Sequence, residues 1–92
     1  MYKVEKINNS YVTENPYITI IEHENNCYTV ENSCAIFYGF CKKLDGDRAE
    51  FRVNKEFNKK TNKTMRKNTK AFREDSLYFV YIIENFAHNY NQ

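Results

Sequence analysis

The sequence has little glycine and little proline, with two glycines and one proline in 92 residues. These two residue types mark many turns and loops, so we expect few and short loops. No stretch reaches the roughly 18 apolar residues that a membrane-spanning helix needs. The first ten residues lack a charged-then-apolar signal region, and we therefore expect a cytoplasmic protein that does not engage a membrane.

The length sets a second limit. Residues 1–92 fit one domain, since domains commonly run to about 100–150 residues. This size excludes most cofactor-binding and two-domain enzymes, and we expect no cofactor. Aromatic residues make up 16% of the chain. A disordered chain is poor in aromatics, so the chain is expected to fold.

The three cysteines, Cys27, Cys34 and Cys41, form an odd set without a signal region, which favours reduced thiols in the cytosol. No pair has the C-x-x-C spacing typical of zinc sites. We considered zinc with His23, and we expect instead that the cysteines act as small buried apolar residues.

The first part of the chain predicts strands, because β-branched and aromatic residues alternate with asparagine-rich turns. The expected strands are Tyr2–Ile7, Tyr11–Glu14, Tyr17–His23 and Cys27–Glu31. Asn25 and Asn26 fit a hairpin tip, since asparagine tolerates the positive φ that such tips need.

The strongest predicted strand is Cys34–Lys43, which is apolar on both faces and so is expected to be central and covered on both sides. Tyr38 and Phe40 are expected to pack in the core. Phe37–Phe40 matches only part of the RNA-recognition-motif signature, so base stacking by these rings was the weaker interpretation. Asp45 and Gly46 predict a turn into a further strand, Arg48–Asn54.

After Asn54 the two-residue alternation ends. At about 100° per residue, five basic residues fall along one line: Lys59, Lys63, Arg66, Lys70 and Arg73. This pattern favours a basic amphipathic helix, with Leu77–Ile83 as the last strand and Phe86 and Tyr90 packing back on the sheet. We therefore predict an α+β fold: a meander-like antiparallel sheet of five to six strands, with one basic helix before the last strand.

The charge is unevenly distributed. Residues 1–41 carry −3, residues 42–73 carry +8 and residues 74–92 carry −3, so twelve of the fourteen basic residues lie in one third of the chain. Basic clusters attract polyanions through counterion release, although a solvated surface explains many such clusters. The predicted partner-binding residues are Lys42, Lys43, Arg48, Arg52, Lys59, Lys63, Arg66, Lys70 and Arg73.

Two functions remain open. The first is a non-enzymatic binding protein that uses residues 42–73 to engage nucleic acid or a nucleoprotein complex. The second is a protein–protein inhibitor that docks on an acidic surface of a host nuclease or defence complex, by analogy with anti-CRISPR proteins in size and composition alone. Asn, Lys, Ile, Tyr and Phe make up 45 of the 92 residues; their AT-rich codons are common in phages and mobile elements. A homo-oligomer is compatible with either function.

Catalytic and metal motifs are not recognisable in the sequence. His23 is expected to be an exposed histidine at a strand end, with no nucleophile placed near it by a known motif. Asp45–Asp47 lacks the continuation of an EF-hand and is expected to be a hairpin turn. We therefore expect neither enzyme activity nor a metal site.

Overall fold

The computed structural model describes residues 5–13, 15–73 and 79–90. These residues form seven strands, one short 3₁₀ turn and one α-helix. The strands are β1 (Glu5–Ile7), β2 (Ser10–Val12), β3 (Thr19–Glu22), β4 (Cys27–Glu31), β5 (Ala35–Lys43), β6 (Ala49–Asn58) and β7 (Lys63–Arg73). The 3₁₀ turn covers Glu24–Asn26, and the helix α1 covers Phe79–Asn89.

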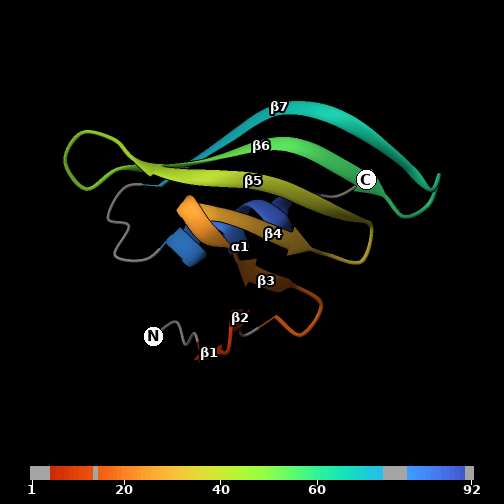
Figure 1. Cartoon of the computed structure of the whole chain (residues 1–92), viewed down its shortest axis with the longest axis horizontal. Coiled ribbons are helices and arrows are strands. Elements are labelled where there is room, and N and C mark those ends of the chain that lie inside the picture. The colour runs from red at the N-terminus through yellow and green to blue at the C-terminus, as the bar shows by residue number, and fades with distance from the viewer. Residues whose placement is uncertain (1–4, 14, 74–78, 91–92) are drawn as a thin grey trace.

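The strands form a single antiparallel sheet in chain order, β1 to β7. The sheet arches over α1, and the longest strands, β5, β6 and β7, form the top of the arch (Figure 1). The α+β class and the antiparallel meander are confirmed. The expected count of five to six strands is wrong, since the described residues contain seven.

The predicted helix before the last strand is also wrong. Residues 63–73 form β7, and the helix follows the last strand instead. β7 pairs in the described sheet only with β6, and most of its side chains are exposed. Its sequence therefore lacks the alternation of polar and apolar residues that marks a half-buried strand. The final helix also contains no lysine or arginine.

Much of the segment predicted as the last strand, Leu77–Ile83, lies instead in α1; residues 77 and 78 fall outside the described part. The apolar run continues as a helical stripe once the following residues are included. Phe79, Ile83, Phe86 and Tyr90 recur at three- and four-residue intervals, and Phe86 is buried as expected.

The strand predictions for the first half are confirmed with shifted ends, apart from residues 1–4 and 14, which are not described. Asparagine supplies most of the left-handed turn positions, with φ near 57° at Asn8, Asn25, Asn26 and Asn62. Gly46 has the same conformation, with φ 63°. These asparagines explain how a chain with two glycines turns so often.

The core lies between α1 and one face of the sheet. In β5, Ala35, Phe37 and Cys41 are buried on this face. The Phe37 ring meets Phe86 of α1 edge-on, with a centroid separation of 5.0 Å. On the opposite face, Ile36, Tyr38 and Phe40 are only partly buried, so the expectation that β5 is covered on both faces is wrong. Cys41 is buried as expected, whereas Cys34 is partly buried and Cys27 is exposed, so the prediction of buried cysteines is wrong for Cys27.

The side chain of Asn32, in the β4–β5 turn, holds α1 against the sheet. Its amide nitrogen donates to the carbonyl oxygens of Ala87 and Tyr90 at 3.2 and 3.3 Å, and its oxygen accepts from the backbone N–H groups of Cys34 and Ala35. Carbonyls at a helix C-terminus have no partner within the helix. Asn32 therefore caps α1 and closes the turn with one side chain.

Candidate functional site

The face of the sheet that points away from α1 carries a mixture of basic and aromatic side chains on β5, β6 and β7. The alternating burial along β5 and the register with β6 and β7 assign the side chains to this face. We call it the open face. It comprises Ile36, Tyr38, Phe40, Lys42, Glu50, Arg52, Lys55, Phe57, Thr64, Arg66, Lys70 and Phe72.

Four of the nine predicted binding residues lie together on the open face: Lys42, Arg52, Arg66 and Lys70. Arg52 of β6 is opposite Lys70 of β7. Lys55, which the sequence prediction did not include, lies opposite Arg66 one step further along. Directly paired residues in antiparallel strands have Cβ atoms about 4.5–5.5 Å apart. The hairpin of β6 and β7 therefore produces a compact basic patch.

Two other predicted residues lie on the helix side of the sheet. The Lys43 ammonium group is 5.6 Å from the centre of the Phe79 ring, and the Arg73 guanidinium is 5.6 Å from the centre of the Tyr81 ring. Both rings belong to α1. These cations therefore cover helix aromatics, and a partner bound to the open face would not meet them.

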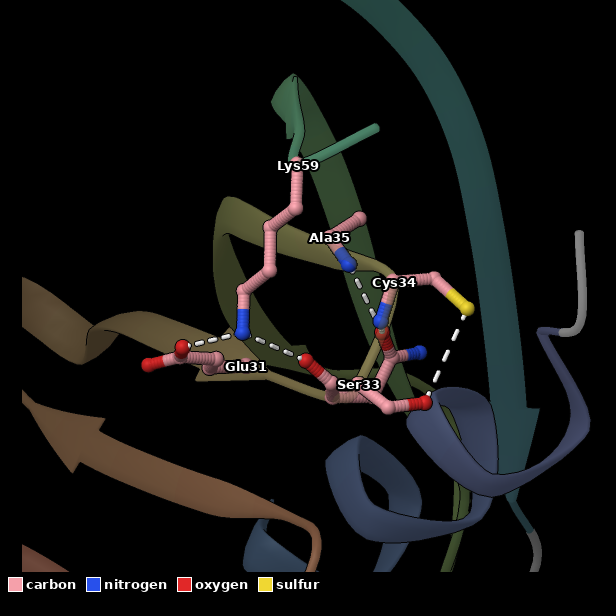
Figure 2. Close-up of polar contacts among 6 residues, drawn as sticks. Glu31, Ser33, Cys34, Ala35 and Lys59 are labelled. Carbon is pink, nitrogen blue, oxygen red and sulfur yellow. Dashed lines mark hydrogen bonds and ion pairs between the residues drawn. The ribbon is translucent and has the colours of Figure 1, made fainter. Parts of the chain in front are cut away.

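The three remaining predicted residues lie in turns or at a strand end. Lys59 reaches across to the β4–β5 turn (Figure 2), where its ammonium forms an ion pair with Glu31 and donates to the Asn32 carbonyl oxygen at 2.9 Å. Arg48 is exposed in the turn between β5 and β6, and Lys63 is exposed at the start of β7. The structure does not bring these three to the open face.

A single carboxylate interrupts the cations of the open face. Glu50 is 3% exposed, and its Oε2 atom lies 3.7 Å from Lys42 Nζ and 3.5 Å from Arg52 Nη2. This acid balances part of the charge at one end of the patch. Lys55, Arg66 and Lys70 add three further cations to the open face, so a net positive charge remains there.

A second buried acid is neutralised on the helix side. Glu56 Oε1 accepts from Lys67 Nζ at 3.0 Å and from the Tyr90 hydroxyl at 3.3 Å. The bond to Glu56 raises the pKa of Lys67. Lys67 therefore supports the packing of α1, and it adds nothing to the open face.

The aromatic side chains on the open face are more exposed than the sequence predicted. Tyr38 and Phe40 are only partly buried and do not belong to the core cluster. The expectation that they pack in the core is therefore wrong. Phe57 is also partly exposed, and Phe72 is 53% exposed. The reason is that β5 is apolar on both faces while the one described helix covers a single face.

A shallow hollow of about 650 Å³ opens beside Tyr38, where the sheet is irregular. The register between β5 and β6 shifts after Tyr38, and Asn54 is the extra residue on β6. Gly39 makes this possible, because a Cβ atom there would lie 2.9 Å from the Phe51 ring and closer still to the Arg52 carbonyl oxygen. β-Bulges commonly occur beside functional sites.

Polar side chains of several types line this hollow. Lys55 and Arg66 border it, together with His23 and Cys27 from the β3–β4 turn region. His23 is exposed, as expected, and its Nε2 atom lies 2.7 Å from Thr29 Oγ1. Among the described residues, no three His, Cys, Asp or Glu side chains form a group that could hold a metal ion.

Two further observations concern the described structure and the comparisons with known proteins. No helix within it has the length and apolar character needed to cross a bilayer. In comparisons with known proteins, no family model, curated protein or solved structure matches the sequence significantly.

Proposed function

We propose that the protein binds nucleic acid through the open face, without catalysing a reaction. The observation that carries this proposal is the cross-strand arrangement of basic residues on β6 and β7. Arg52 faces Lys70 and Lys55 faces Arg66, which places four cations on one surface of a rigid hairpin. Cations that neutralise phosphates release condensed counterions, and this release provides affinity without sequence specificity.

The distribution of acidic residues supports the same surface. Glu22 is engaged with Lys6 and with the Tyr11 hydroxyl, and Glu31 is engaged with Lys59. These acids lie outside the β6–β7 hairpin, and residues 49–73, which form the hairpin, hold only Glu50 and Glu56 against nine lysines and arginines. A polyanion that approaches the hairpin therefore meets a local excess of positive charge, although the whole chain carries a formal charge of only +2.

The test uses two double variants with the same change in net charge. Arg66→Glu with Lys70→Glu reverses the charge of two open-face residues. Lys60→Glu with Lys63→Glu reverses the charge of two exposed lysines, one in the β6–β7 turn and one at the first position of β7. Binding of a labelled single strand and a duplex is followed by anisotropy at several salt concentrations. We expect the first variant to lose binding and the second to retain most of it.

The salt dependence gives a quantitative check. For a single strand, log K falls with log salt by about 0.7 for each phosphate neutralised. If Arg66 and Lys70 each contact one phosphate, removing both lowers the slope by about 1.4. Absence of binding to both nucleic acids at low salt would refute the proposal, as would equal losses in the two variants, because location on the open face would then not matter.

An acidic protein surface is the alternative partner. Such a partner, on a host nuclease or defence complex, would satisfy the same cations and would make the protein an inhibitor. A pull-down from nuclease-treated host extract separates the two functions. If the partner is an acidic protein, the pull-down still recovers a stoichiometric protein partner, and purified nucleic acid does not bind.

A further inference from the structure

We infer that the nucleic acid bound by the open face is single-stranded, with unpaired bases stacked on Tyr38 and Phe40. This inference rests on the proposed function and specifies its ligand. The two rings occupy successive open-face positions of β5, about 7 Å apart along the strand. Both are partly exposed and outside the core cluster.

Each of the two rings has a cation directly opposite on β6. Tyr38 pairs with Lys55, and Phe40 pairs with Arg52. The Lys55 ammonium lies 4.9 Å from the centre of the Tyr38 ring. A ring that takes a base and a neighbouring cation that takes its phosphate make one nucleotide subsite. The register repeats this arrangement at Phe40, where Arg52 is also ion-paired with Glu50.

The hollow at the bulge gives the first subsite additional room. The hollow lies next to Tyr38, where Asn54 is the extra residue of β6, and it is lined by Gly39, Asn54 and Lys55. Arg66 borders the same hollow from β7. A base that lies on Tyr38 can extend its edge into the indentation, while Lys55 moves from the ring to a phosphate.

A duplex cannot use these features. Its bases are stacked on each other inside the helix, and its outer surface presents phosphates and groove edges. Proteins that bind single strands commonly combine a positively charged groove with aromatic stacking platforms. The apolar rings between the cations of the open face are therefore explained by an unpaired strand, whereas phosphate contacts alone leave them unexplained.

The test introduces a fluorescent reporter at the ring. The chain contains no tryptophan, so selective excitation of Tyr38→Trp gives a tryptophan emission that comes only from the proposed subsite. Tyr17→Trp is the matched control, because Tyr17 is 75% exposed and lies before β3, outside the open face. We expect a single-stranded oligonucleotide to quench the tryptophan at position 38 and to leave the one at position 17 unchanged. A duplex is expected to quench neither.

A second measurement uses ring removal. We expect Tyr38→Leu and Phe40→Leu each to weaken single-strand binding between about 5-fold and about 150-fold, which is the range for loss of one stacked base. A single strand of abasic sites should bind the wild-type protein more weakly than either variant binds the normal strand, because it lacks both stacked bases. Circular dichroism and the thermal unfolding midpoint show whether each variant is folded.

The possible results separate the two proposals. If duplex binds as tightly as single strand and the leucine variants bind like wild type, the stacking inference is overturned while nucleic-acid binding stands. If neither nucleic acid binds at low salt, both proposals fail. Binding of an acidic polypeptide with the same affinity as the single strand would also overturn the inference, since charge alone would then explain the interaction.

Discussion

Replacement of Asn32 is expected to loosen the attachment of α1 to the sheet. Asn32 is 7% exposed and makes four hydrogen bonds through its side chain. Two of them satisfy carbonyls at the end of α1, and two accept backbone N–H groups at the start of β5. Asn32→Ala removes all four bonds and leaves a buried N–H group of Ala35 without this acceptor.

The size of the effect follows from these bonds. An unsatisfied buried donor costs about 1–3 kcal/mol, and a typical hydrogen bond contributes about 0.5–1.5 kcal/mol. We expect Asn32→Ala to lower the free energy of unfolding by about 2–4 kcal/mol, a large fraction of the roughly 5–15 kcal/mol typical of domains. For a domain of this size, the midpoint of thermal unfolding should then fall by about 8–32 °C.

Urea unfolding followed by circular dichroism measures this change directly. Asn68→Ala, in an exposed position of β7, is the control and should alter stability little. Asn32→Asp keeps the two acceptor positions and loses the donors, and its charge lies beside the negative end of the helix dipole. It should therefore also destabilise the fold. A loss below about 0.5 kcal/mol for Asn32→Ala would refute the assigned role, because surface substitutions already fall in that range.

Three further predictions concern other parts of the molecule. Gly39→Ala forces a Cβ atom against the Arg52 carbonyl oxygen, so its urea midpoint should fall well below that of wild type. The Tyr11 hydroxyl donates to Glu22 at 2.6 Å and holds the pKa of that carboxyl below its usual range; the pair stabilises the fold at neutral pH, and its contribution is lost as pH falls through the lowered pKa. The stability difference between wild type and Tyr11→Phe should therefore shrink in acid, and a difference constant with pH would contradict this assignment. Burial raises the pKa of the Cys41 thiol, so mass spectrometry should find Cys41 unlabelled by a thiol reagent until denaturant is added.

The sheet was largely predictable from local patterns. The continuous apolar run of β5, the alternation at the start of β6 and the turn asparagines specify strands and hairpins without reference to the rest of the fold. Asn25 and Asn26 adopt the positive φ expected of a tip. These strands and turns are determined by residues close in sequence, so local sequence patterns are enough to predict them.

The exchange of helix and strand near the C-terminus arose from two misleading signals. β7 is a long strand at the edge of the described sheet, with both faces largely wet, so it lacks the alternation of a half-buried strand. In α1, the run Phe79–Ile83 appears continuously apolar, as in a buried strand. The helical stripe is visible only when Phe86 and Tyr90 are read together with it.

The candidate site was only partly predictable, because residues 63–73 were predicted to form a helix and instead form β7. The concentration of charge in residues 42–73 is visible in the sequence, whereas the face of each residue depends on β7 being a strand. Helical spacing grouped Lys63 with Arg66, and the observed strand separates them. Lys55 was missed because its place opposite Arg66 follows from the register with β7.

The most direct test of the open face as a nucleic-acid interface is an NMR measurement of intermolecular contacts. Wild-type protein is mixed at low salt with a single-stranded oligonucleotide, and nuclear Overhauser effects between protein side chains and nucleotide protons are recorded. We predict contacts from the rings of Tyr38 and Phe40 and from Arg66, and none from α1. Contacts confined to α1 or to the turn at residues 59–62, or an unchanged spectrum, would contradict the proposal.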